Sequence, residues 1–511
     1  MTVATTLRFG VTRDEPVTGR RRRTIAVTTE WVFLVLFVGG LAWVPFLFGG
    51  NAPIAWGINA VVFGALAALY ELSLVLRGAS HPVPIRRVGV SAVLFALVTI
   101  WILVQNVTWT PTGWQHPIWH LASETLGQPI AGSISVDRDL TALALLRLMT
   151  AASAFWLALQ LCRDATRARM LIWSVVGIGA LYAAAGLFAV AFMPNGRLFA
   201  ELAPIPGFNK QLVTSTFVNQ SHYSTFAGIG LIACVAGILR LYRREMGRSG
   251  RLWRLQIAAL LEATASRMAL PLAFAVVIMT SLLLTGSRGG IVATAFGLLA
   301  VFALNMHRRS SGSRRSETLI FLFAALAVAA TFVGFSDVFV GRLAEQGLHD
   351  AGRPVVWTLT IRSILSAPLL GFGYGTFSTV FPMFRDDSTS VYGVWAQAHN
   401  TYLEVFQGLG LLFGAMLIAC VAVLVWGCVR GARRQRGATI PAIAASVSVL
   451  VGVQALVDFS LQLQAVTLTY MAVLGAGVAQ ASDPSPNGIA PVANSTDDTI
   501  RWRGSSHERW I

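Results

Sequence analysis

The sequence predicts an all-α integral membrane protein with about twelve transmembrane helices. Of its 511 residues, 55% are hydrophobic and only 12% are charged, whereas soluble domains carry roughly 25% charged residues. A bilayer core needs a helix of about 20 apolar residues, and twelve apolar runs of about this length occur along the chain. Because membrane β-barrels use strands of only about 10 residues, these runs indicate helices.

The runs divide the chain into a membrane domain and two short termini. Residues 1–30 form a basic N-terminus that we expect in the cytoplasm, residues 31–481 the transmembrane domain, and residues 482–511 a disordered cytoplasmic tail. No small-residue cleavage site follows the first run, so we interpret it as a retained span. The predicted spans are 31–50, 55–76, 88–107, 140–162, 170–193, 220–239, 268–286, 290–306, 318–336, 399–429, 438–458 and 464–481.

Lysine and arginine are distributed unevenly between the two predicted sides of the membrane. If the N-terminus is cytoplasmic, the inside segments hold 29 of the 39 Lys and Arg residues and the outside segments hold eight. Arg147 and Arg267 fall within or beside spans. The positive-inside rule therefore places both termini in the cytoplasm. Because most of these basic residues lie in segments that flank predicted spans, we interpret the net charge of +16 as suited to the headgroups of a lipid bilayer rather than to nucleic acid.

Three predicted outside segments are long, about 108–139, 194–219 and 337–398, and long ordered loops of this kind usually carry function. The last is a large late periplasmic loop that contains a predicted helix from about 352 to 366. Spacing along this helix predicts an interfacial helix on the outer membrane surface. The face that lies on the membrane is predicted to hold Arg353, Trp357, Ile361, Ile364 and Leu365.

Three arginines on the predicted outer side are candidates for binding phosphate. Arg288 lies in the turn "LLTGSRGG", whose small residues would let a bulky ligand approach the backbone. The alternative is an arginine that extends its head to water at a tight hairpin. Arg342 and Arg353 lie in the large loop, where a guanidinium can form bidentate bonds to phosphate or simply contact headgroups.

Two polar pairs lie beside predicted spans on the same side. His399 and Asn400 begin the tenth span, where a histidine can act as a general base or remain an interfacial residue without chemistry. Asn219 and His222 precede the sixth span, and Asn219 could instead cap that helix. Inside the fourth span, Arg147 is functional by default, although it could pair with Asp137 or Asp139.

The sequence shows no pattern for a metal or a disulfide framework. The four cysteines all fall in predicted spans, and no cluster of Asp, Glu and His with metal-ligand spacing lies in the outside segments. This favours a reaction that needs no metal, and we expect no cofactor.

From about residue 280 to 415, with weaker support from 135 to 235, the chain resembles the bacterial O-antigen ligase and O-antigen polymerase superfamily. The resemblance is carried by "TGSRGG", "GRL", "GRPVVWTLTIRSILSAPLLGFGYGTF" and "HNTYLEVFQGLGLL". After the histidine, the chain departs from the family pattern. It has "FQGLGLL" where an acidic residue often precedes the glycine, and Phe413 stands before Gly414.

The resemblance implies glycosyl transfer at the periplasmic face of the bacterial inner membrane. The donor would be a saccharide on undecaprenyl pyrophosphate, and the acceptor a sugar hydroxyl of a lipid A core or of a growing glycan, so that ligation and polymerisation both stay open. His399 is then predicted as the catalytic base and Arg288 as a catalytic cation that stabilises the leaving pyrophosphate. The predicted substrate-binding residues are Arg353, Arg342, Asn400, Asn219, His222 and Trp357, of which Trp357 could instead anchor the interfacial helix.

Two other classes of function compete with the enzyme. A transporter or flippase for a polysaccharide or glycolipid would also need many spans and arginines, but it predicts inverted repeats and polar residues near the midplane. The sequence shows no clear internal repeat, and its polar candidates lie at the outer edge. A non-catalytic partner of an export machine would be expected to lack Arg288 or His399, and both are present.

The predicted topology can be tested by labelling single cysteines from outside the cell. A cysteine introduced at residue 350 should react with a membrane-impermeant reagent, while cysteines at 312 and 490 should be spared, because charge places residues 337–398 outside and both termini inside. The reverse labelling pattern would contradict the assignment of every candidate residue to the outer face.

Overall fold

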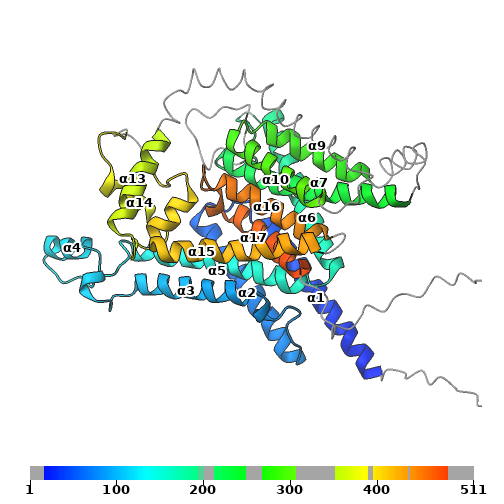
Figure 1. Ribbon diagram of the computed structural model, residues 1–511, viewed down its shortest axis with the longest axis horizontal. Helices are drawn as coiled ribbons and strands as arrows, with labels where there is room; N and C mark the ends of the chain where they lie inside the picture. Colours follow the sequence, from blue (N-terminus) through cyan, green and yellow to red (C-terminus); the bar gives the residue numbers. More distant parts are fainter. Residues whose placement is uncertain are drawn as a thin grey trace, which may run out of the picture. The chain divides into compact units, whose positions relative to one another are not determined.

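In the computed structural model, helices and the loops between them make up the described residues, and no strand occurs among those residues (Figure 1). The predicted ninth span at 318–336, Arg342 and the tail from 482 lie outside the described residues. The described residues are 17–193, 195–196, 198, 212–248, 268–306, 352–389, 395–434 and 438–481.

A helix lies at each of the eleven predicted spans within the described residues. The first half of the chain contains α1 (Val17–Trp43), α2 (Pro53–Arg77), α3 (Gly89–Asn106), α4 (Ile118–Leu126), α5 (Arg138–Leu161), α6 (Ala165–Phe192) and α7 (Gln220–Arg248). The second half contains α9 (Ala269–Leu283), α10 (Arg288–Met306), α13 (Gly352–Ser366), α14 (Phe377–Phe384), α15 (Thr401–Arg434), α16 (Thr439–Gln454) and α17 (Gln464–Ala481).

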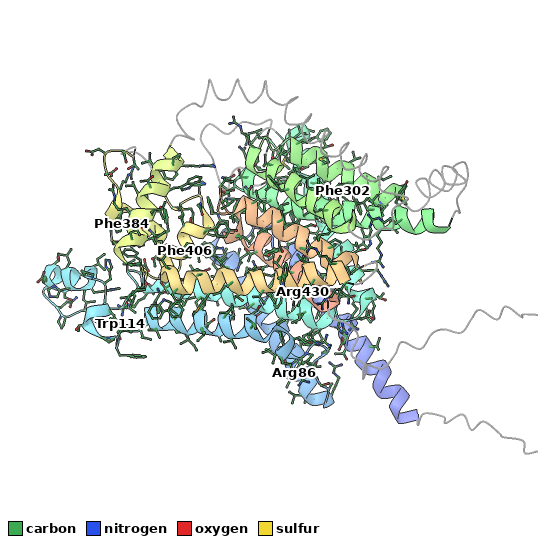
Figure 2. The ribbon with its side chains drawn as sticks, viewed as in Figure 1. Arg86, Trp114, Phe302, Phe384, Phe406 and Arg430 are labelled. Carbon is green, nitrogen blue, oxygen red and sulfur yellow. The ribbon has the colours of Figure 1, made fainter. Side chains whose placement is uncertain are left out.

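Several of these helices are built to cross a membrane. Six of those described are long and apolar enough to do so, and four shorter apolar helices accompany them. The chain is therefore a multi-pass membrane protein, and the count of about twelve spans stays a prediction. Helices α3 and α15 run side by side in opposite directions (Figure 1). Figure 2 shows Arg86 and Arg430 toward one end of this pair and Trp114 and Phe384 toward the other.

The centre of the bundle is α17, which packs on α5, α15 and α16. Most of its residues are buried, because it carries small or apolar side chains on every face. A Cβ atom at Gly475 would lie only 2.5 Å from the Phe155 carbonyl oxygen, and one at Gly477 would lie 2.2 Å from the Ala444 Cβ. Small residues therefore let the helix backbones approach closely, as is usual in membrane bundles.

Helix α15 is interrupted at Gly410, which has φ 77° and ψ 169°. The interruption leaves backbone carbonyls without helical partners, and such groups must be satisfied inside a membrane protein. The glycine-rich segment 371–375 provides donors, since Phe372 N–H donates to Gln407 O and Gly373 N–H donates to Gly408 O, both at 3.0 Å. The side chain of Gln105 on α3 also donates to Gly408 O at 2.8 Å. The motif "GFGYG" thus serves to bind the broken helix.

The predicted helix in the large loop exists as α13. Its buried residues are Val356, Leu359, Thr360, Ser363 and Ile364, and the helix packs on α14 and α15. Of the residues predicted to lie on the membrane, Ile364 is buried, whereas Ile361 and Leu365 are exposed. Protein neighbours therefore cover one part of α13, and its contact with the membrane surface stays a prediction.

The predicted turn "LLTGSRGG" joins α9 to α10 through close packing on α7. A Cβ atom at Gly290 would lie 1.8 Å from the Ser224 Oγ, so only glycine fits without displacement of the helices. Ser287 in the same turn donates a hydrogen bond to the Ser221 hydroxyl at 3.1 Å. The small residues of this motif therefore bring the first turn of α10 against the first turn of α7.

Replacing Gly290 by alanine should destabilise the protein. The added methyl group must push α7 and α10 apart, and overpacking of this kind costs about 1–3 kcal/mol. Gly64→Ala in α2 is the matched control, because a Cβ there meets nothing within 4 Å and alanine favours a helix interior. Thermal unfolding in detergent measures both variants. A melting temperature of Gly290→Ala equal to that of wild type would contradict the close approach.

Candidate functional site

A buried carboxylate lies at the centre of the site. Asp458 follows α16 in the loop of residues 455–463, and its side chain is only 4% exposed. Its Oδ2 accepts hydrogen bonds from Gln454 Nε2 at 3.2 Å and Ser460 Oγ at 3.0 Å. Its Oδ1 accepts the Phe459 backbone N–H at 2.9 Å. Five groups face this carboxylate. Four of them are side chains, and two of these four side chains are histidines.

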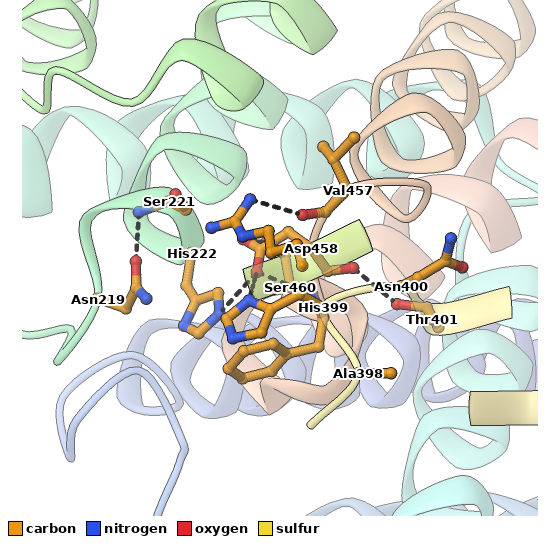
Figure 3. A network of polar contacts seen from close by, with 12 residues as sticks. Asn219, Ser221, His222, Ala398, His399, Asn400, Thr401, Val457, Asp458 and Ser460 are labelled. Carbon is orange, nitrogen blue, oxygen red and sulfur yellow. Dashed lines mark hydrogen bonds and ion pairs between the residues drawn. The ribbon is translucent and has the colours of Figure 1, made fainter. Parts of the chain in front are cut away.

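Two histidines from distant parts of the chain face the same oxygen of Asp458 (Figure 3). His222 Nε2 from the first turn of α7 lies 3.5 Å from Oδ1, and His399 Nδ1 from the loop before α15 lies 3.6 Å from it. Neither nitrogen has another hydrogen-bond partner within the described part of the chain. The Phe459 ring packs against both imidazoles, with centroids 4.4 and 4.9 Å away.

The charge of Asp458 is set by these neighbours. Burial by itself raises the pKa of the carboxyl group, but the close approach of the His222 and His399 imidazoles, together with the Phe459 N–H bond, outweighs burial and lowers the pKa below its ordinary value. Asp458 is therefore an anion that both imidazoles face. An anion next to one ring nitrogen favours the tautomer with the proton on that nitrogen, which leaves His399 Nε2 and His222 Nδ1 as the proton acceptors.

The two histidines differ in access to solvent. The His222 side chain is 3% exposed and the His399 side chain 22% exposed. His399 can therefore meet a substrate, whereas His222 is enclosed by protein. This difference separates two residues that the sequence treated alike as polar candidates on the outer side.

The backbone at His399 is in the left-handed region, with φ 53°, which is uncommon for a residue with a side chain and clusters at functional sites. The preceding residue, Ala398, is fully buried. Its carbonyl accepts the Trp357 indole N–H at 2.9 Å, and its N–H donates to Glu404 Oε1 at 2.6 Å. Side chains thus fix the peptide groups next to His399.

Two different helices place Arg353 and Arg288 near the loop that carries Asp458. Arg353 on α13 donates from Nη1 to Val457 O at 3.2 Å, next to Asp458 in the chain. Arg288 is the first residue of α10, and a Cβ atom on the adjacent Gly289 would lie 3.3 Å from Val457 Cγ2. Two of the three predicted cations are therefore near one loop.

The remaining predicted binding residues have structural contacts. Asn219 Oδ1 accepts the Ser221 N–H at 2.7 Å, which is the helix-capping alternative. Asn400 caps α15 by accepting the Leu403 N–H at 3.1 Å and donates to Leu456 O at 3.0 Å. Trp357 is directed to Ala398, so its indole N–H positions the backbone before His399.

The sequence suggested that Arg147 could pair with Asp137 or Asp139, but the structure does not show this pair. Its guanidinium donates to the Gln462 carbonyl and stacks 4.4 Å from the Trp56 ring centroid. Asp137 instead caps α5, accepting the Leu140 N–H at 3.0 Å. The physical reason is that an N-cap carboxylate is already engaged with its own helix, so Arg147 turns toward the loop after Asp458.

An apolar cavity of about 810 Å³ lies among α3, α5, α15, α16 and α17. Most of its lining is aliphatic or aromatic, including Phe95, Leu148 and Leu424. Arg147 and Glu404 are among its few charged lining residues, and Thr401, two residues after His399, also lines it.

Asp458 and Glu404 are the residues of this arrangement that the sequence candidates did not include. Asp458 stood at the end of the predicted span 438–458, but α16 ends at Gln454 and leaves the acid in a loop. The available signal was a lone carboxylate between two long apolar runs. No group of three or more His, Cys, Asp or Glu side chains that could hold a metal occurs among the described residues.

The chain was compared with known protein families. Residues 272–417 match the family described as O-antigen ligase, a segment that contains Arg288, Arg353 and His399. His222 and Asp458 lie outside it, so the matched segment is completed by parts of the chain before and after it. Comparison with the curated proteins gave no match. The family match confirms that this chain is similar to the O-antigen ligase and polymerase superfamily, with the matched domain at residues 272–417.

Proposed function

We propose that the chain is a glycosyltransferase acting at the periplasmic face of the bacterial inner membrane, with both termini cytoplasmic. It would transfer a saccharide from undecaprenyl pyrophosphate to a sugar hydroxyl of a lipid A core or of a growing glycan. The observation that carries the proposal is the partly exposed His399, which lies in the O-antigen ligase segment and faces the buried carboxylate of Asp458.

The reaction needs a base for the acceptor. His399 Nε2 takes the proton of the acceptor hydroxyl while the oxygen attacks the anomeric carbon of the donor sugar. The bond from that carbon to the pyrophosphate oxygen breaks, and the lipid pyrophosphate leaves with the electron pair. Asp458 keeps the His399 proton on Nδ1 and stabilises the imidazolium that forms, as a carboxylate does for a catalytic histidine elsewhere. His222, enclosed beside the same carboxylate, is a positioning residue.

The leaving group requires positive charge. A pyrophosphate gains charge as the sugar bond breaks, and preorganised cations at that position stabilise the transition state. Arg353 and Arg288 are our candidates because both lie near the Asp458 loop. Arg342 stays a third candidate from the sequence. We propose that these guanidinium groups stabilise the pyrophosphate in place of a metal cation and that the reaction is metal-independent.

The apolar cavity supports a lipid-linked donor. It lies within the membrane-spanning bundle, its lining is largely hydrocarbon, and it includes Thr401 close to His399. A hydrocarbon chain in this cavity would contact a largely apolar lining. Its head would lie toward the end of α15 at which Thr401 and His399 are found. The arginine-rich end of α15, near Arg430 in Figure 2, is the opposite end of that helix, consistent with a site on the side away from the cytoplasm.

His399→Ala should lower the transfer rate by about 10²–10⁴-fold, the usual contribution of a general base, while donor binding stays close to that of wild type. Asp458→Asn should lower the rate in the same way because it removes the anion that orients His399. Asp386→Asn is the control, since this carboxylate is exposed and forms an ion pair with the exposed Arg362. Single-turnover transfer and equilibrium donor binding measure the three variants.

Two results of this assay would contradict the proposal. Near-normal transfer by His399→Ala would remove it as the base, and absence of any new glycosidic bond with wild-type protein would favour the transporter. Wild-type assays in excess chelator test the metal claim separately. Activity that is lost there and restored by Mg²⁺ or Mn²⁺ would overturn metal independence.

Arg353→Lys and Arg288→Lys should weaken donor affinity and slow transfer. Lysine keeps the charge but loses the planar fork that binds two phosphate oxygens at once, and the pyrophosphate is present in both the ground state and the transition state. Arg362→Lys is the matched control on α13, because Arg362 is 62% exposed and faces Asp386. If both lysine variants behave like this control, the arginines do not bind the pyrophosphate.

A further inference from the structure

Glu404 in the first turn of α15 connects the two loops that form the site. Its Oε1 accepts the Ala398 N–H at 2.6 Å, directly before His399. Its Oε2 accepts the side-chain N–H of Gln462, four residues after Asp458. One carboxylate therefore binds the segment that carries the base and the loop that carries its acidic partner.

The two segments are also joined directly after His399. Asn400 donates to Leu456 O at 3.0 Å, and the Thr401 hydroxyl donates to Asp458 O at 3.1 Å. Glu404 adds a link before His399: the Ala398 carbonyl accepts Trp357, while the Ala398 N–H donates to Glu404. The Gln462 carbonyl accepts Arg147, while the Gln462 side chain donates to Glu404.

The two contacts use both oxygens of one carboxyl group. Each oxygen can accept an N–H, so the group satisfies two N–H donors at once, whereas an amide has one accepting oxygen and one donating nitrogen. Position matters here because His399 Nδ1 lies 3.6 Å from Asp458 Oδ1, and a small shift of either segment changes that approach.

We propose that Glu404 is a positioning residue for the transfer reaction, which sets the distance between His399 and Asp458 by binding Ala398 and Gln462 together. The proposal rests on the proposed function, since it assigns His399 as the base. Glu404 acts through the base and its acidic partner, so its loss should lower kcat while KM for the donor changes little.

The test exchanges the two side chains. Glu404→Ala removes both accepting oxygens and leaves the Ala398 N–H and the Gln462 side-chain N–H without this partner, so it should lower kcat by about tenfold, as expected for buried donors left unpaired. Gln462→Glu alone sets two carboxylates against each other and should lower kcat further. The double variant Glu404→Gln, Gln462→Glu restores both contacts, because the amide oxygen accepts Ala398 N–H and its nitrogen donates to the new carboxylate.

The double variant should therefore recover most of the wild-type kcat, a rescue that general destabilisation does not produce. A kcat of Glu404→Ala equal to that of wild type would overturn the proposal, and so would a double variant no better than Gln462→Glu alone. If Glu404→Ala does not fold, Gln462→Ala decides instead: it keeps the bond to Ala398 but removes the link, and wild-type kcat would again overturn the proposal.

Failure of the proposed function gives a different result. Near-normal transfer by His399→Ala contradicts the role of the base whatever the Glu404 variants do. A large effect of His399→Ala together with no effect of Glu404→Ala contradicts positioning alone. Donor binding and thermal unfolding, measured on every variant, separate a change in kcat from loss of folded protein.

Discussion

The buried carboxylate of Asp458 is the constraint on which the geometry of the site depends. An anion with 4% exposure must be compensated by donors. The donors come from α16, from the loop itself, from α7 and from the segment before α15. Because these elements are far apart in the sequence, one charge requires several parts of the bundle to meet. Both histidines face the Asp458 carboxylate because it is the buried charge that must be compensated.

A second constraint is the need to satisfy backbone groups inside a membrane bundle. The break of α15 at Gly410 exposes carbonyls, and the segment 371–375 provides N–H groups for two of them. The segment that follows α13 is thereby attached to α15 at Gln407 and Gly408, farther along the chain than His399. Helix α13 in turn places Arg353 at Val457 and Trp357 at Ala398. The glycine motif therefore contributes to the site through the position of its neighbours.

The family match covers the segment from α9 to the middle of α15, yet the geometry of the site extends beyond it. The matched segment contains the exposed histidine and two arginines, while the carboxylate and the enclosed histidine come from outside it. A chemical group and the group that orients it are thus encoded far apart. In the reaction that we propose, the matched segment supplies the base, and the anion that favours its tautomer comes from outside that segment.

The sequence by itself determined the all-helical membrane fold, since apolar runs of about 20 residues and the arginine distribution have few other physical solutions. It also identified His399, His222, Arg288 and Arg353, because charged or titratable side chains beside long apolar runs are conspicuous. It did not determine Asp458 or Glu404 as part of the arrangement, the buried face of α13, or the partner of Arg147. Each of these depends on which helices lie next to one another. Spacing along one helix predicts a face, but only the neighbours in the tertiary structure decide whether that face meets protein, a cavity or lipid.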